Sequence, residues 1–363
     1  MIEEKDHLKY HPSIARPPAK PLTLFFPRNL HQIKNLIKIA GGLIYSLISR
    51  RVLVWGDPLI AHIEPTSLCN LNCPLCPAGT GLLSRYRTKL DFRKFKIILD
   101  KLPSSLRLLL LWNQGEPFLV KDLAKMIQYA KSRNIYVVTS TNGHFSRTEK
   151  AAIDLVNTNL DELIISLDGA DQQTYEKYRV GGELKIVFDG IQRIATTKKI
   201  LNRQNPLIHI QFIMMRHNLH QMEKITQIGR ELGADKTSFK TVQLGDFENG
   251  ENFLPTDLKY TRYFKKDASG KYTTGKRRFF PNDCLRLWYS MVINCDGKVS
   301  PCCFDKDGVY AFGNLLDEPF HAIWYGKKFN DFRQQLLDSR YEFDMCKDCS
   351  EGLKTLFTRT IKY

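Results

Sequence analysis

The chain has no cysteine between Cys76 and Cys284, although its 363 residues include nine cysteines. Buried cysteines that serve only as small hydrophobic residues would be scattered more evenly, whereas tight groups with short spacings indicate metal ligation. Three such groups are present: Cys69, Cys73 and Cys76; then Cys284, Cys295, Cys302 and Cys303; then Cys346 and Cys349.

An export signal is also missing, because the first residues, Met1 to Lys9, are charged and contain no apolar core segment. We therefore expect a reducing, cytoplasmic environment, in which disulfides are rare. The uncharged stretch from Ile39 to Ser49 is too short to span a bilayer.

Acidic residues are scarce relative to basic ones, with 38 Asp and Glu against 54 Lys and Arg, so the formal net charge is +16. Such an excess favours an anionic partner: a phosphorylated or nucleotide-linked substrate, an acidic membrane surface, or nucleic acid. It is also compatible with a role in solubility alone. The composition is otherwise ordinary for a globular protein, with 43% hydrophobic residues.

The first 57 residues are predicted to form an extension. Met1 to Pro27 is rich in proline and charge, which is typical of a loosely ordered segment. Asn29 to Val54 has the pattern of an amphipathic helix and carries Lys34, Lys38, Arg50 and Arg51. Such a helix can lie on an anionic membrane surface, as a peripheral contact, or pack against the main domain, which is the interpretation that we favour.

From Pro58 onward, apolar strand-like runs alternate with helical patterns, which indicates a parallel sheet covered by helices. Six such units predict an α/β fold, a partial (β/α)6 TIM-like barrel with its site at the C-terminal ends of the strands. The strands are expected at Leu59–Glu64, Leu106–Trp112, Ile135–Ser140, Glu162–Leu167, Ile208–Met214 and Thr237–Val242, and the helices at Phe92–Leu102, Asp122–Arg133, Thr148–Val156, Leu184–Lys198 and Asn218–Leu232.

Three thiols stand within the run from Cys69 to Cys76, directly after the first apolar strand. A loop with this spacing can bind three corners of a cubane iron–sulfur cluster and leave the fourth iron open, which is what a catalytic metal site needs. The run resembles the signature of the radical SAM superfamily, and the resemblance covers roughly residues 58 to 363. It implies a [4Fe–4S] cluster that binds S-adenosylmethionine (SAM).

Further motifs follow in the order that the family uses. Gln114 to Pro117 resembles the Gly-Gly-Glu-Pro motif that holds the SAM amino group, with glutamine in place of the first glycine. A carboxylate suits that ammonium electrostatically, and a glycine lets the backbone approach the ligand. By this resemblance the cofactor-binding residues are Gly115, Glu116, Thr141 and Asn142, then Ser166 and Asp168 for the ribose hydroxyls, and Arg179 for the carboxylate.

The last cysteines resemble the SPASM/twitch auxiliary-cluster domains of this superfamily. A hairpin, Met291–Asn294 and Lys298–Ser300 around Asp296-Gly297, is predicted to present one ligand. The implied ligands of a second, auxiliary [4Fe–4S] cluster are Cys284, Cys302, Cys346 and Cys349. No cysteine follows Cys349, so the spacing is more similar to the single-cluster twitch form; a four-cysteine zinc site is the alternative.

The predicted organisation has four parts. They are the basic extension (residues 1–57), the radical SAM partial barrel (58–255), a basic linker or flexible lid (256–283) and the SPASM/twitch domain (284–363). Cys295 and Cys303 have no assignment, and no catalytic acid or base can be named. His209 is expected to be a structural histidine with satisfied hydrogen bonds.

The resemblance implies an oxidoreductase that cleaves SAM reductively to a 5′-deoxyadenosyl radical, which abstracts hydrogen from its substrate. The expected substrate is a small molecule or carbohydrate, phosphorylated, nucleotide-linked or lipid-linked, and the expected electron donor is a flavodoxin or ferredoxin. One alternative is a maturase that modifies a peptide or protein. A second is a non-catalytic metal-binding protein; nucleic acid is not the expected partner.

Overall fold

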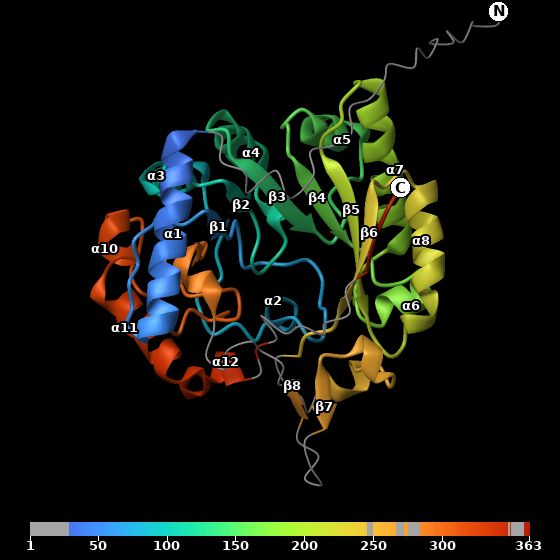
Figure 1. The fold of residues 1–363 in the computed structure, drawn as a ribbon. Coiled ribbons are helices and arrows are strands. Elements are labelled where there is room, and N and C mark those ends of the chain that lie inside the picture. Colours follow the sequence, from blue (N-terminus) through green and yellow to red (C-terminus); the bar gives the residue numbers. More distant parts are fainter. Residues whose placement is uncertain (1–28, 245–249, 266–271, 275–283, 348, 350–358) are drawn as a thin grey trace, which may run out of the picture.

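The computed structural model describes residues 29–244, 250–265, 272–274, 284–347, 349 and 359–363. Its centre is one large twisted sheet (Figure 1). The strands of this sheet are β1 (Ile60–Ile63), β2 (Leu108–Leu110), β3 (Tyr136–Thr141), β4 (Glu162–Ser166), β5 (Leu207–Met214), β6 (Lys236–Thr241), β9 (Ser290–Ile293), β10 (Val299–Ser300) and β11 (Arg359–Lys362).

The six expected barrel strands are confirmed. Strands β1 to β6 lie side by side in chain order and every adjacent pair is parallel. The order across the whole sheet is β10-β9-β1-β2-β3-β4-β5-β6-β11, so other strands continue it beyond β1 and beyond β6. The barrel is therefore partial, as the number of strand–helix units predicts.

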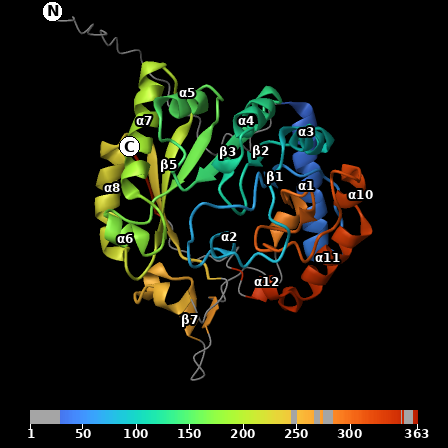
Figure 2. The same cartoon turned by 180° about the vertical axis from the view of Figure 1, so that it is seen from behind.

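Helices cover the outer face of the curved sheet, as both views show (Figures 1 and 2). Their starts follow local capping chemistry: Asp91 caps α3 by accepting from Lys94 N at 2.8 Å, and Thr148 caps α5 by accepting from Ala151 N at 3.2 Å. The helices after β1 are α2 (Pro77–Thr80), α3 (Phe92–Lys101), α4 (Leu123–Ser132), α5 (Glu149–Val156), α6 (Gln172–Glu176), α7 (Leu184–Ile200) and α8 (Met222–Glu231).

The C-terminal part shares the barrel's sheet. Strands β9 and β10 form the predicted antiparallel hairpin, and β9 pairs in parallel with β1. Strand β11 pairs antiparallel with β6 at the other end of the sheet. The sheet thus runs across the predicted boundary at residue 284, and the remaining C-terminal helices are α10 (Phe320–Trp324), α11 (Lys327–Asp338) and α12 (Asp344–Lys347).

Two segments outside the barrel differ in how far the structure describes them. Helix α1 (Leu30–Ser49) lies within the predicted Asn29–Val54 helix and packs on the outside of the molecule. In the predicted linker, the described residues include a two-stranded pair, β7 (Tyr263–Lys265) and β8 (Tyr272–Thr274); residues 266–271 and 275–283 lie outside the described residues. Among the described helices, none combines the length and apolarity needed to cross a bilayer.

Candidate active site

The loop that follows β1 carries the first three cysteines across the mouth of the barrel. Cys73 is buried and Cys69 and Cys76 are half-buried. Cys76 caps α2, which begins at the next residue. Close packing holds the loop: a Cβ at Gly79 would lie 2.7 Å from Cys73 N, so only glycine fits there.

These thiols border a cavity of about 160 Å³ at the C-terminal ends of the strands. Six of the seven predicted SAM-contact residues border it as well, all but Asp168. The lining residues are Cys69, Leu71, Cys73, Cys76, Gly79, Trp112, Asn113, Gly115, Glu116, Ser140, Thr141, Asn142, Ser166 and Arg179. The structure therefore brings the first cysteine group and most of the predicted cofactor residues to one place, although they come from five different segments of the chain.

Gly115 and Glu116 form the wall of this cavity after β2. Gly115 has φ of +71°, and a Cβ there would lie 2.4 Å from the carbonyl oxygen of Thr66, so the position requires glycine. The buried Glu116 carboxylate accepts hydrogen bonds from Thr141 Oγ1 at 2.9 Å and Asn142 N at 2.7 Å. Burial raises the pKa of Glu116 to about 7 despite these donors.

This raised pKa predicts a pH-dependent stability. Without SAM, the folded protein binds the Glu116 proton more tightly than the unfolded chain, in which the pKa is 4.5. Protonation of Glu116 therefore stabilises the folded state by about 3 kcal/mol relative to high pH. This contribution is complete below about pH 4.5 and is lost as the pH rises through 7. We expect urea unfolding between pH 5 and 8 to show this slope in wild type and to lose it in Glu116→Gln, and equal slopes would contradict the assignment.

On the opposite wall, Arg179 is held by Asp168. Its Nε and Nη2 lie 2.6 Å from Asp168 Oδ2, and Asp168 Oδ1 accepts from Ile213 N at 2.6 Å. Nη1 of Arg179 also lies 3.7 Å from Cys73 Sγ. Burial alone would lower the pKa of Arg179, but Asp168 and Cys73 raise it well above its ordinary value. Asp168 is fully buried and lies behind Arg179, whereas Ser166 borders the cavity.

The residues present fit a cluster with bound SAM. Burial raises the pKa of Cys69 to about 11, with further increases from Glu116 and the neighbouring thiols, so thiolates here need a cationic partner such as iron. Asn113 Oδ1, which is buried beside the cavity, has no hydrogen-bond partner among the described residues. No three His, Cys, Asp or Glu side chains of the described residues converge tightly enough for a single metal ion.

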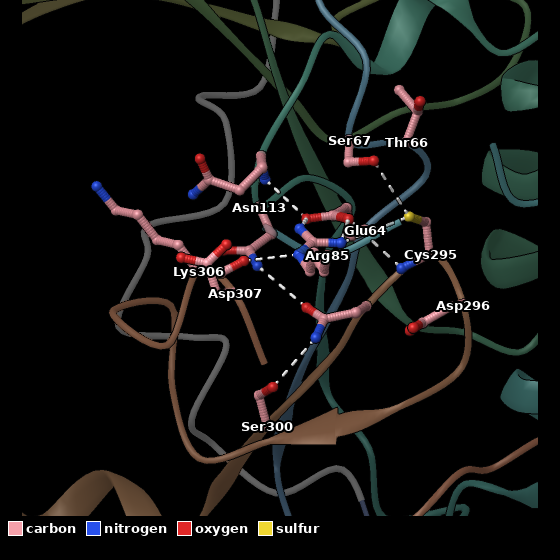
Figure 3. A network of polar contacts seen from close by, with 12 residues as sticks. Glu64, Thr66, Ser67, Arg85, Asn113, Cys295, Asp296, Ser300, Lys306 and Asp307 are labelled. Atoms are coloured by element: carbon pink, nitrogen blue, oxygen red, sulfur yellow. Dashed lines mark hydrogen bonds and ion pairs between the residues drawn. The ribbon is translucent and has the colours of Figure 1, made fainter. Parts of the chain in front are cut away.

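A buried ion pair that the sequence analysis missed ties this site to the C-terminal part (Figure 3). Arg85 donates from Nη1 and Nη2 to the Glu64 carboxylate at 2.7 and 2.6 Å, and from Nε to the carbonyl oxygen of Lys306 at 2.6 Å. Glu64 Oε2 also accepts from Gln114 N at 3.1 Å. One feature of the sequence pointed to such a pair: Glu64 ends an apolar strand. A carboxylate that is buried there requires a partner.

The four predicted auxiliary ligands lie in one region, near enough for their charges to affect one another. Burial raises the pKa of Cys302, and Cys284 and Cys346 lie close enough to raise it further. Burial likewise raises the pKa of Cys284 to about 11, and Cys349 adds to that increase. Cys302 follows the hairpin strand β10, as the sequence predicts.

The cysteines without an assignment lie in different surroundings. Cys295 Sγ is 3.7 Å from both Arg85 Nη1 and Ser67 Oγ, in the network of Figure 3. Cys303 Sγ accepts from Arg286 Nη1 at 3.5 Å.

The hydrogen-bonding groups of His209 are satisfied, as predicted. Its Nδ1 lies 2.6 Å from Glu162 Oε1, and its Nε2 lies 2.6 Å from Ser238 Oγ. Both ring nitrogens therefore have partners on neighbouring strands, which fits a structural role.

Two sequence-family models match the chain. The model described as the radical SAM superfamily matches residues 63–227, and the model described as an iron–sulfur cluster-binding domain, SPASM, matches residues 284–350. The second match favours an iron–sulfur cluster over a zinc site at the C-terminal cysteines.

Solved structures with a similar fold include proteins that are distant in sequence. Streptococcus suis SuiB bound to its precursor peptide SuiA is 14% identical, with 86% of this chain and 75% of that chain covered and a TM-score of 0.57. The structure of anSMEcpe with AdoMet and the Cp18Cys peptide is 16% identical (81% and 88% covered, TM-score 0.52). BtrN in complex with AdoMet and 2-DOIA is 19% identical (83% and 98% covered) at a TM-score of only 0.47.

Proposed function

Because the chain belongs to the radical SAM superfamily and is an iron–sulfur enzyme with a C-terminal SPASM domain, we propose that it oxidises a small, largely apolar or lipid-linked molecule. When bound, the cluster and SAM supply a 5′-deoxyadenosyl radical, which removes a hydrogen atom from a substrate carbon. The auxiliary cluster is proposed to assist the oxidation, and a flavodoxin or ferredoxin to donate the electron.

The chain's own residues are proposed to bind and orient these groups. Cys69, Cys73 and Cys76 would hold the cluster, and Glu116 and Arg179 would take the SAM amino and carboxylate groups as charge-assisted partners. Ser166 faces the cavity and remains the candidate for a ribose hydroxyl.

For Asp168 we propose a role other than binding the ribose hydroxyls. Because both of its carboxylate oxygens are already engaged, by Arg179 and by Ile213 N, we assign it to orienting Arg179. Thr141 and Asn142 orient Glu116 in the same way through their hydrogen bonds to its carboxylate.

The proposed substrate class rests on a second, larger cavity beside the cluster loop. It has a volume of about 840 Å³, within the range of sites for small molecules. Pro74 and Leu75 of the cluster loop border it on one side, and residues 304–310 of the C-terminal part border it on another. A substrate bound there would lie between the two cluster sites.

The lining of this cavity favours an apolar substrate over a phosphorylated or nucleotide-linked one. Among the residues that the structure describes, most of the side chains that line it are apolar or aromatic, and the charged ones are three aspartates and one lysine, Lys306. Such a wall repels phosphate but binds alkyl or prenyl carbon well. The lining residues are Pro74, Leu75, Pro77, Thr80, Leu82, Gln243, Leu244, Tyr263, Phe304, Asp305, Lys306, Asp307, Val309, Tyr310, Asp344 and Met345.

The test measures 5′-deoxyadenosine after anaerobic cluster reconstitution and dithionite reduction. Lipid, aqueous and peptide fractions of a cell extract are added in turn, each from ordinary and from deuterated cells. We expect the lipid fraction to stimulate formation about tenfold or more, and the deuterated lipid fraction to place deuterium in 5′-deoxyadenosine. No 5′-deoxyadenosine under any condition, from cluster-replete protein, would overturn the radical reaction itself.

Stimulation by another fraction would overturn only the substrate class. A response to peptides would favour the maturase alternative; SuiB and anSMEcpe are two proteins of this fold with peptides bound. Since likeness at 14 to 16% identity shows fold alone, the cavity lining decides our preference.

A substitution in the cavity wall gives an independent check. Val309→Asp places a charge at a cavity position that is apolar in wild type. We expect the substrate-stimulated rate to fall about tenfold or more, because apolar substrate then binds against an unpaired charge. Ile153→Asp, a partly exposed apolar position on α5 away from both cavities, is the matched control, and an equal loss in both variants would count against this site.

A further inference from the structure

Helix α1 turns a mixed polar and apolar face toward the protein and a second, apolar face toward solvent. Its buried positions are Gln32, Asn35, Ile39, Gly42 and Ser46. On the other side, Ile37, Ile44 and Ile48 are 64%, 56% and 79% exposed. A helix that packs on a globular core normally presents polar side chains to solvent, so the outer face requires its own explanation.

Polar contacts attach the inner face. Asn35 exchanges two hydrogen bonds with the backbone of Asp57, at 3.0 and 2.8 Å, and Gln32 Oε1 accepts from Arg107 Nη1 at 3.1 Å. The exposed isoleucines therefore contribute little to holding α1 in place, and changing them leaves the attachment intact.

Five exposed aliphatic side chains form one narrow stripe along α1. At about 100° per residue, they fall within about 60° of the helix circumference. Trp55, which is 56% exposed, lies beside the helix next to Gly41. The stripe consists of Leu30, Ile33, Ile37, Ile44 and Ile48.

Basic residues accompany the stripe. Lys34 and Lys38 on α1 and Arg50 and Arg51 directly after it are all exposed, and no acidic residue occurs from position 29 to 56. Figure 1 shows α1, in blue, along the outer surface of the molecule, and Figure 2 agrees. A stripe of isoleucines beside lysines and a tryptophan is typical of helices that lie in a membrane interface.

We propose that the α1 face, defined as the apolar stripe, Trp55 and these four basic residues, binds the surface of an anionic lipid bilayer. The charge decides between this partner and a second copy of the chain. A symmetric dimer would bring the same basic patch of both copies together, whereas an anionic bilayer is complementary to it. This inference is independent of the proposed reaction, since binding is measured without turnover.

Flotation of the full-length, cluster-loaded protein with vesicles tests it. We expect binding to vesicles of phosphatidylcholine with phosphatidylglycerol and at least tenfold weaker binding to phosphatidylcholine alone. Ile37→Asp/Ile44→Asp/Ile48→Asp should lose binding at least tenfold. Lys34→Gln/Lys38→Gln should weaken it by roughly fivefold for each charge removed.

Two further measurements keep the proposal falsifiable. Ile200→Asp on α7, at a residue that is 73% exposed, is the matched control and should bind as wild type does. Trp55 fluorescence should shift to the blue on adding anionic vesicles, and Trp55→Phe should abolish that shift. Equal vesicle binding by wild type and the triple variant would overturn the proposal. So would a wild-type protein that is dimeric and does not bind vesicles, if the triple variant is monomeric.

Discussion

Replacing Cys73 by alanine abolishes 5′-deoxyadenosine formation and removes about half of the iron, from about eight to about four atoms per chain. Cys73 is the buried member of the first cysteine group and lies 3.7 Å from Arg179 Nη1. Its loss leaves the first cluster with two protein thiolates, while the auxiliary cysteines keep theirs. Iron and acid-labile sulfide per chain, measured together with 5′-deoxyadenosine, report the two effects separately.

Cys295→Ala is the matched control, because Cys295 is equally buried but lies outside both proposed ligand sets. We expect it to keep all of the iron and to form 5′-deoxyadenosine at close to the wild-type rate. Retention of 5′-deoxyadenosine formation by Cys73→Ala would disprove the ligand assignment. Loss of iron by both variants would instead point to a general folding defect.

Replacing Arg85 by methionine lowers the free energy of unfolding by about 3–5 kcal/mol, the usual cost of leaving a buried charge without its partner. The Glu64 and Arg85 side chains are 0% and 6% exposed, so water cannot take the place of the missing guanidinium. The same guanidinium binds the carbonyl oxygen of Lys306, so its loss also removes one link between the barrel and the C-terminal loop. Urea denaturation under anaerobic conditions measures the change.

An exposed ion pair supplies the comparison. Lys150→Met removes the partner of Asp154, where the two side chains are 82% and 54% exposed, and should cost less than about 1 kcal/mol. The double variant Glu64→Gln/Arg85→Met should be destabilised by less than the sum of its single variants, since neither unpaired charge remains. Additive effects would show that Glu64 and Arg85 do not stabilise each other. Equal costs for Arg85→Met and Lys150→Met would show that burial does not strengthen this pair.

Much of the first site follows from sequence alone because its determinants are local. The spacing of Cys69, Cys73 and Cys76 sets three thiols in one loop, and a loop needs no distant contact to offer them to a cluster. The strands and helices follow from hydrophobic periodicity and from caps such as Asp91 and Thr148, which act within three residues. Glu116 could be named because Gln114 to Pro117 resembles the Gly-Gly-Glu-Pro motif of the family and stands directly after a predicted strand.

What the sequence could not supply depends on contacts between residues far apart in the chain. Arg85 and Lys306 are 221 positions apart, and the pairing of β9 with β1 brings their parts of the chain into one sheet. Likewise, the sequence places Asp168 at a strand end but not behind Arg179, because the approach of the two side chains depends on the turn between them.

For helix α1, too, some properties follow from the sequence and others from the tertiary structure. The sequence determines that it is a helix with apolar and basic positions, because periodicity is a local property. Which face turns inward is decided by the tertiary structure, through the hydrogen bonds of Asn35 to Asp57 and of Gln32 to Arg107. Those polar partners satisfy buried groups that would otherwise be costly to desolvate, and they leave Ile37, Ile44 and Ile48 facing outward while Ile39 is buried.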